Sequence, residues 1–224
     1  MLTKQIIELK EKLIKSALLV ESMIEKSIKG FNEKNADTLF EVIKRDEPQV
    51  NQYDRDIDEM CTTFIAQYEP MARDLRTVLM VLKMNNDLER MGDHAVNISE
   101  SGLFLITRPF LKTSVNISVM GQTAMSMLKD SLQAFINEDT KLARDVCERD
   151  NIVDNLGDLI LEEVTKFLKE EHDGVKRSLH LMRISHNIER IADLSTNICE
   201  EVIYIIEGKN IKHHQGDDNG PKDI

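Results

Sequence analysis

Two Glu-x-x-x-Asp pairs recur in the chain, Glu89 with Asp93 and Glu189 with Asp193. Side chains four residues apart lie on one face of an α-helix, so both carboxylates of a pair can reach the same partner. Adjacent carboxylates repel each other, and in a partly desolvated groove this repulsion raises a pKa or recruits a cation. Their hard oxygen atoms suit Mg, Ca, Mn or iron. Each pair is therefore a candidate metal-binding site.

The two acidic pairs lie inside an internal repeat. Residues 85–100, NNDLERMGDHAVNISE, align with residues 185–200, SHNIERIADLSTNICE. Composition alone gives roughly one identity in a window of this length, whereas six positions are identical: Glu89/Glu189, Arg90/Arg190, Asp93/Asp193, Asn97/Asn197, Ile98/Ile198 and Glu100/Glu200. Arg45-Asp46 and Arg149-Asp150 also resemble each other upstream of the two motifs. The repeat predicts a duplicated structural unit.

An apolar stripe leads into each acidic pair. Steps of three and four residues pass through Leu79 and Leu82 and reach Glu89 and Asp93, and the second copy repeats the pattern from Leu179. Such steps mark one face of a helix. We expect the leucines to occupy packing positions and the acids to continue the same face.

Antiparallel pairing of neighbouring helices, folded about Pro70 and Asp173, places further acids opposite these pairs. A single Glu-x-x-x-Asp pair is usually a solvated helix face. Two pairs at matching positions, each facing acids of a neighbouring helix, favour a functional site instead. The facing residues are Glu47, Asn51 and Asp54 in the first half and Asp150, Asp154 and Asp158 in the second. The predicted metal ligands are Glu47, Asp54, Glu89 and Asp93, and Asp150, Asp154, Glu189 and Asp193.

Helical periodicity runs through almost the whole chain, interrupted at a few polar, glycine or proline sites. Pro109 marks the midpoint, and Pro48 falls inside a predicted helix, where it removes a hydrogen bond and predicts a kink or break. The predicted helices cover residues 4–29, 36–68, 71–105, 113–137, 140–170 and 175–207. The fold class is therefore all-α, with two tandem, pseudo-symmetric three-helix bundles over 1–108 and 109–208. Residues 209–224 lack apolar periodicity, which predicts a disordered tail.

The composition agrees with helices and restricts the partners. The 224 residues include no Trp, few glycines and prolines, and a formal net charge of −11. Without a cluster of Lys and Arg, this charge argues against a nucleic-acid binder. The N-terminus lacks the apolar core of a signal peptide, no stretch approaches the ~20 apolar residues that span a bilayer, and three widely spaced cysteines suit a reducing compartment. We expect a cytoplasmic protein.

Two segments, DLERMGDHAVNI and NIERIADLSTNI, resemble the signature helices of the PhoU family, and PMARDLR at 70–76 resembles the opening of that family's third helix. The resemblance covers roughly residues 1–208. It implies two three-helix bundles related by a pseudo-twofold axis, multinuclear clusters of iron or zinc on the acidic motifs, and a homodimer. Asn51 stands where the family usually has an acid, and Ala192 and Leu194 replace the Gly92 and His94 of the first copy.

The resemblance also implies a function. Members of the family act with the ATPase of the phosphate ABC transporter and with a phosphate sensor histidine kinase, and they restrain phosphate uptake and the phosphate-starvation response when phosphate is plentiful. Association with the membrane would then occur only through these partners. We therefore expect a negative regulator rather than an enzyme. In agreement, the sequence contains no nucleophile paired with a base, no glycine-rich phosphate loop and no dinucleotide fingerprint.

Two other functions remain open. A di-iron carboxylate oxidase also uses acids within a helical bundle, but it relies on Glu-x-x-His, and here Gly92 and Ala192 follow the two glutamates at that spacing. A metal-free helical adaptor would result if every acid were solvated.

Several other side chains near the motifs have simpler interpretations. Arg90 and Arg190 could clamp an anion, but each precedes an Asp by three residues and is expected to pair with it. His94 and His186 have no histidine counterpart in the other half, and His186 is the better candidate for an extra ligand. Six methionines are expected to fill the core or a dimer surface: Met80, Met84, Met91, Met120, Met125 and Met127.

Overall fold

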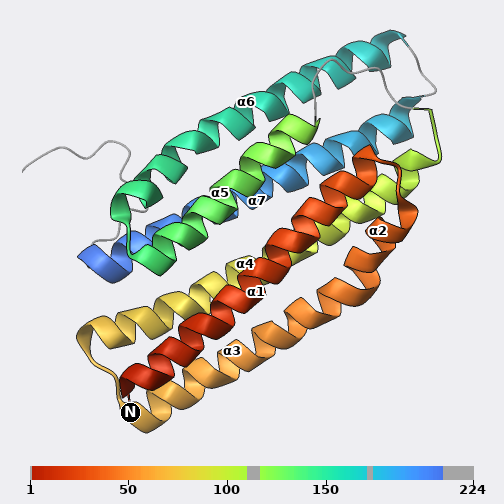
Figure 1. Cartoon of the computed structure of the whole chain (residues 1–224). Coiled ribbons are helices and arrows are strands. Elements are labelled where there is room, and N and C mark those ends of the chain that lie inside the picture. Colours follow the sequence, from red (N-terminus) through yellow and green to blue (C-terminus); the bar gives the residue numbers. More distant parts are fainter. Residues whose placement is uncertain (1, 110–116, 171–173, 209–224) are drawn as a thin grey trace, which may run out of the picture.

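The structure, a computed structural model, describes residues 2–109, 117–170 and 174–208, and all of its regular elements are helices. They follow one another along the chain as long rods with roughly parallel or antiparallel axes (Figure 1). Their bounds are α1 (Leu2–Asn32), α2 (Ala36–Glu41), the π-helical turn η1 (Val42–Asp46), α3 (Glu47–Tyr68), α4 (Ala72–Ile106), α5 (Ile117–Asn137), α6 (Thr140–Glu170) and α7 (Val175–Glu207). The predicted all-α fold class is confirmed.

Local chemistry explains where several helices begin and end. Asn35 caps α2, because its side-chain oxygen accepts a hydrogen bond from Thr38 N at 3.2 Å. Asp139 caps α6 in the same way, since its Oδ1 accepts from the backbone N–H groups of Lys141 and Leu142. Gly208 follows α7 with φ of +70°, a conformation that glycine adopts without strain.

The predicted break at Pro48 is confirmed. The helix predicted over residues 36–68 is divided into α2, the π-helical turn η1 and α3, and Pro48 lies in the first turn of α3. A proline lacks the N–H that an α-helical interior requires, but it is tolerated in a first turn. The wider π turn directly before Pro48 therefore lets the chain remain helical through this region.

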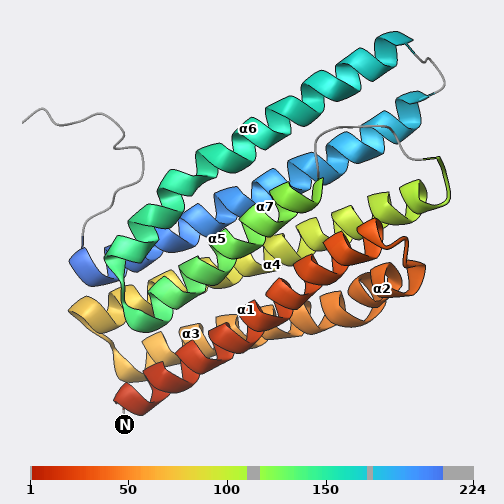
Figure 2. The ribbon, with the colours of Figure 1, turned by 45° about the horizontal axis from the view of Figure 1, so that its top comes forward.

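The third helices of the two halves, α4 and α7, pack against each other in antiparallel directions. Lys83 Nζ of α4 lies 3.4 Å from Glu201 Oε1 of α7, and Arg183 of α7 lies 3.1 Å from Glu100 of α4. Helices α1 to α3 lie on one side of this pair, and α5 and α6 lie on the other side (Figure 2). The molecule therefore consists of two tandem three-helix units, as the repeat predicts, joined along α4 and α7.

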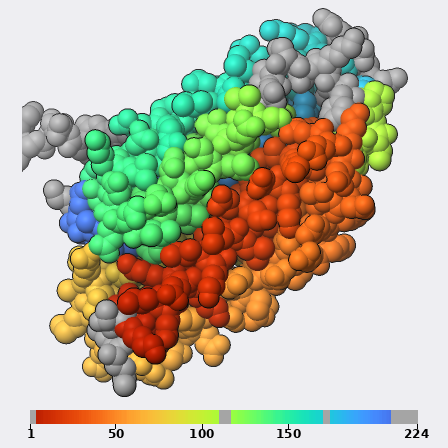
Figure 3. Space-filling model, viewed as in Figure 1, coloured from red at the N-terminus to blue at the C-terminus, as the bar shows by residue number. Residues whose placement is uncertain are grey.

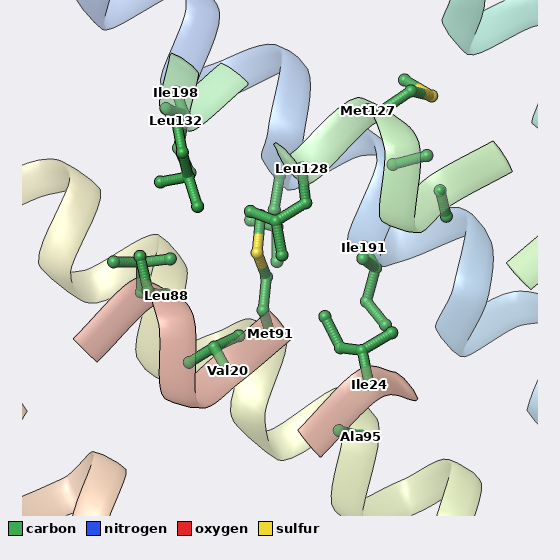
Figure 4. Close-up of a cluster of buried hydrophobic side chains, with 14 of the residues drawn as sticks. Val20, Ile24, Leu88, Met91, Ala95, Met127, Leu128, Leu132, Ile191 and Ile198 are labelled. Carbon is green, nitrogen blue, oxygen red and sulfur yellow. The ribbon is translucent and has the colours of Figure 1, made fainter. Parts of the chain in front are cut away.

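A continuous apolar core runs through both units. Leu88 and Met91 of α4, Leu128 of α5, Ile198 of α7 and Val20 of α1 are each 1% exposed or less, and their side chains gather between the helices (Figure 4). Helices α1 and α5 also meet on one face of the molecule (Figure 3). Five of the six methionines singled out in the sequence are buried, and Met125 is partly buried against this core. The two units thus share a core rather than presenting separate ones.

In the described part of the chain, we found no helix with enough length and apolar character to cross a membrane. The predicted tail at 209–224 and the first residues of the helix predicted from 113 lie outside the described residues. The division of the chain at residue 108 stays a prediction.

Candidate metal-binding site

In the second half, α6 and α7 bring acidic side chains together. Burial, followed by the negative charges of Asp154, Asp193 and Glu189, raises the pKa of Asp150 from 3.8 to about 6. Asp150 Oδ1 is buried and has no hydrogen-bond partner in the described part of the chain. A carboxylate oxygen in this condition is costly when charged. A cation placed between these groups would remove the cost.

The neighbouring acids of this half show the same effect. Burial raises the pKa of Asp154, with added contributions from Asp193 and Asp158. Burial likewise raises the pKa of Glu189, although the positive charge of His186 opposes the effect of the nearby aspartates. Helix α6 passes close to this carboxylate, since a Cβ atom at Gly157 would lie 3.4 Å from Glu189 Oε2, an ordinary van der Waals contact. The four predicted acids of the second half therefore influence one another electrostatically.

In the first half, α3 and α4 form a corresponding group. Burial raises the pKa of Glu89, and the charges of Asp93, Asp54 and Glu47 raise it further, in that order. Here, however, side-chain amides donate hydrogen bonds to some of the carboxylate oxygens. Asn51 Nδ2 donates to Glu47 Oε1 at 2.6 Å, and Asn85 Nδ2 lies 2.8 Å from Asp54 Oδ1.

In both halves, acids of neighbouring helices thus lie close enough to raise one another's pKa values. Oxygen-rich donor sets of this kind fit iron and other hard cations. The buried, unpartnered oxygen of Asp150 also fits a bound cation. Across the described residues, however, no three Asp, Glu, His or Cys side chains are positioned to hold one ion as they stand. Metal binding by the eight predicted residues, and the choice of iron or zinc, stay predictions.

The apolar stripe that leads into the motifs does not lie where the spacing predicts. Leu79 is 39% exposed and Leu179 is 62% exposed, whereas Val78, Val81 and Leu88 of the same α4 helix are fully buried. The expectation that the leucines are packing positions was therefore wrong at both of these residues. The acids and this stripe share the flank of the helix that borders solvent, and the face next to it fills the core.

The expected arginine pairs are present in one half only. Arg190 donates a hydrogen bond to Asp193 of the same helix. Arg90 instead lies 3.7 Å from Asp87, one turn before it, so the expected pairing with Asp93 was wrong. The first-half motif therefore lacks the Arg–Asp pair that the second-half motif has.

Two polar contacts near the site were not predicted. His94 Nδ1 of α4 lies 2.8 Å from Asn187 Oδ1 of α7, and burial lowers the pKa of His94. This histidine therefore links the two halves. Asn85 Nδ2 donates to Asp54 Oδ1 at 2.8 Å and to Asp58 Oδ1 at 3.1 Å. The sequence offered one indication of this role, because Asn85 lies within the repeated segment that contains Glu89. A groove of about 420 Å³ lies elsewhere, between α1 and α3, and includes none of the predicted acids.

Comparison with known proteins agrees with the repeat. The family model for the PhoU domain matches the chain twice, over residues 13–102 and 117–202. The "Phosphate-specific transport system accessory protein PhoU homolog" of Aquifex aeolicus is 39% identical over 98% of this chain and 99% of that protein. A homologue with the same description from Clostridium acetobutylicum is 33% identical over 91% of this chain and 93% of its own length.

Solved structures show the same architecture. The crystal structure of PhoU from Pseudomonas aeruginosa superposes with a TM-score of 0.90 at 27% identity, covering 93% of this chain and all of that chain. The phosphate transport system regulatory protein PhoU from Streptococcus pneumoniae superposes with a TM-score of 0.87 at 25% identity, covering 94% of this chain and 99% of its own.

Proposed function

This chain belongs to the PhoU family, and from that premise we propose that it is a negative regulator of phosphate uptake and of phosphate-starvation signalling. The observation that carries the proposal is the pair of matched domains, each with an acidic motif on its third helix. The relatives are described as accessory proteins of the phosphate-specific transport system, and one solved neighbour as a regulatory protein of phosphate transport. A role beside that transporter follows for this chain.

The partners that we propose are the ATPase of the phosphate ABC transporter and a phosphate sensor histidine kinase. A regulator without an active site acts by occupying surfaces of its partners, and long rigid helices offer such surfaces. We place the protein in the cytoplasm, at the membrane only through these partners, and as a homodimer. A di-iron oxidase of this type has a histidine three residues after the glutamate, whereas Gly92 and Ala192 occupy that position in the two motifs. We therefore infer an adaptor rather than an enzyme.

The acidic clusters would make this adaptor dependent on a cation. The residues that would hold it are Glu47, Asp54, Glu89 and Asp93 in the first half and Asp150, Asp154, Glu189 and Asp193 in the second. A bound iron or zinc ion would supply positive charge that offsets the repulsion between their carboxylates. The clusters join α3 to α4 and α6 to α7, so ligation would fix the relative positions of each helix pair.

Complementation tests the regulatory proposal. A bacterium that lacks its own family member and carries a reporter of phosphate starvation would receive this chain, and the reporter would be measured in high phosphate. We expect the chain to restore repression, and a tagged copy to retain the transporter ATPase and the sensor kinase in a pull-down. Full reporter activity with a well-expressed, folded chain would contradict the proposal.

The metal-free adaptor is the alternative, favoured because no three Asp, Glu, His or Cys side chains of the described residues are positioned to hold one ion. Elemental analysis of the protein purified without added metals separates the two. Stoichiometric metal supports the cation-dependent adaptor, and its absence together with restored repression supports the metal-free one.

A further inference from the structure

The second half of the chain carries two of the three cysteines, on neighbouring helices. Cys147 lies on α6 and Cys199 on α7, and both are free thiols. The two helices run antiparallel beside each other (Figure 2), since Arg144 near the start of α6 pairs with Glu207 at the end of α7 at 3.0 Å. This register brings the segments around the two cysteines together.

A contact between the helices locates the two sulfur atoms. Cys147 Sγ donates a hydrogen bond to the backbone oxygen of Thr196 on α7 over 4.0 Å. Thr196 precedes Cys199 by three residues, so it lies about one turn earlier on the same face of α7. A helical side chain leans back over the turn that precedes its own Cα. The Cys199 side chain therefore reaches toward the turn that Cys147 contacts, and the two thiols are hydrogen-bonded to each other.

The two sulfur atoms differ in access and in acidity. Cys147 is partly exposed, whereas Cys199 is fully buried. The hydrogen bond with Cys199 lowers the pKa of Cys147, although burial and the charges of Glu200 and Asp150 oppose this effect. The same hydrogen bond, together with burial, raises the pKa of Cys199. A small oxidant therefore meets the more reactive thiol first, and a second thiol lies behind it.

The rest of the described chain offers a contrast to this pair. At the matching positions of the repeat, the first half has Ile43 and Ser99, so the duplicated unit does not require facing thiols for its packing. The third cysteine, Cys61 of α3, is fully buried. Burial, followed by the charge of Asp58, raises the pKa of Cys61 to about 12. Cys61 is therefore an internal control for thiol reactivity.

We propose that Cys147 and Cys199 form a peroxide-reactive dithiol site that closes to a disulfide between α6 and α7. The Cys147 thiolate attacks one oxygen of hydrogen peroxide, the O–O bond breaks, and a sulfenic acid forms while the departing hydroxide takes up a proton to become water. The Cys199 sulfur then attacks the sulfenic sulfur, the S–O bond breaks, and a second water leaves with the proton of the Cys199 thiol. The two thiols lose two electrons in total, and the peroxide accepts them.

The disulfide would lie beside the second acidic cluster. Cys147 precedes Asp150 by three residues, which is about one turn of α6. Disulfides of cytosolic proteins are usually transient, and they act in catalysis or redox sensing. Oxidation therefore joins α6 to α7 covalently next to Asp150, and reduction releases them. This inference does not rest on the proposed role in phosphate regulation.

The test follows the thiols of the full-length protein by mass spectrometry. The protein is treated with hydrogen peroxide, the remaining thiols are alkylated in denaturant, and tryptic peptides are analysed. We expect the peptide 145–149 to be cross-linked to the peptide 191–209, and Cys61 to be alkylated. Dithiothreitol should release the cross-link. Cys147 should be oxidised at least about tenfold faster than Cys61.

Three variants assign the roles of the cysteines. In Cys199→Ala, the cross-link should be lost, and dimedone should trap the sulfenic acid on Cys147. Cys147→Ala should lose both the cross-link and the dimedone adduct. Cys61→Ala is the matched control and should keep the cross-link. Circular dichroism verifies that each variant is folded.

Other results would overturn the inference. Unmodified protein whose three thiols all stay free after peroxide treatment would show that the pair does not react, and this measurement requires no variant to fold. Oxidation of Cys61 as fast as that of Cys147 would show that the contact with Cys199 confers no reactivity. Disulfides between two chains in place of the internal link would refute the pairing. A cross-link that forms with glutathione disulfide but not with peroxide would overturn the choice of oxidant.

Discussion

Asn51 Nδ2 donates a hydrogen bond to Glu47 Oε1 over 2.6 Å, so a neutral amide already satisfies one acid of the first cluster. In the second cluster the same spacing of four residues is filled by two acids, Asp150 and Asp154, and Asp150 Oδ1 is buried without a hydrogen-bond partner in the described structure. The two halves of a duplicated chain therefore differ in how much acidic charge remains for a cation to balance.

This difference predicts unequal metal binding. Replacing Glu189 and Asp193 together by Ala should lower the metal content more than the matching change at Glu89 and Asp93. Elemental analysis of both double variants, purified without added metals, measures the effect. The two variants are matched controls for each other, because each removes one repeat copy of the same motif. Metal content equal to that of the unmodified protein in both would contradict metal binding at these residues.

The raised pKa of Asp150 predicts a pH-dependent stability of the metal-free protein. A carboxyl whose folded pKa is raised from 3.8 to about 6 contributes stability below pH 3.8, and this contribution is lost as the pH rises through 6. Asp150→Asn should therefore stabilise the metal-free protein at pH 7 by about 1 kcal/mol, after allowance for solvent screening of a half-exposed group.

Urea unfolding at pH 7 and pH 4 in the presence of a chelator measures this effect. The gain from Asp150→Asn should be small at pH 4, where the acid is largely protonated in the folded state. Added metal should reverse the order at pH 7, since the variant loses a ligand. A variant that is equally or less stable than the unmodified chain at pH 7 without metal would show that Asp150 is not destabilised by its neighbours.

The sequence was sufficient to predict most of the fold because the helices are long and strongly periodic. Five of the six predicted ranges match single observed helices within a few residues, apart from the part before Ile117 that the structure does not describe. The helix predicted over 36–68 is interrupted where Pro48 predicted it. The sequence was a poorer guide to the buried face of each helix. Leu79 and Leu179 are exposed although they continue an apolar stripe, because packing against the other helices decides which face is buried.

The candidate site was predictable to a similar extent. The repeat located the acidic pairs, and antiparallel pairing of adjacent helices predicted the acids that face them. Contacts between the two halves, such as that of His94 with Asn187, depend on the packing of α4 against α7. No spacing within one helix contains that information.

Lys26 should be needed for stability because it pairs with a buried acid. Its Nζ lies 2.7 Å from Asp46 Oδ2, and Asp46 is 2% exposed. Lys26→Met would leave that carboxylate without its cation and should cost about 2 to 3 kcal/mol, somewhat less than for a fully buried pair. Lys12→Met, whose partner Asp56 is far less buried than Asp46, is the control and should cost clearly less. If chemical unfolding showed that both variants lose the same free energy of unfolding, the burial of Asp46 would not explain the contribution of the Lys26–Asp46 pair.

The shared core predicts that damage in one half destabilises both. Leu88 of α4 is fully buried against residues from the other half, such as Leu132 and Ile198 (Figure 4). Leu88→Ala should lower the free energy of unfolding by about 2 to 5 kcal/mol, because a cavity remains where the side chain packed. Leu179→Ala, at a position that is 62% exposed, should change it by less than about 0.5 kcal/mol.

Hydrogen exchange distinguishes a shared core from two independent ones. If the halves unfold together, Leu88→Ala should reduce amide protection by similar factors in α4 and in α7, although the substitution lies in α4 alone. Unfolding followed by circular dichroism should then show one transition. If protection fell in α1 to α4 while α5 to α7 kept theirs, the halves would be separate cooperative units, and the α4–α7 contact would be an interface between domains.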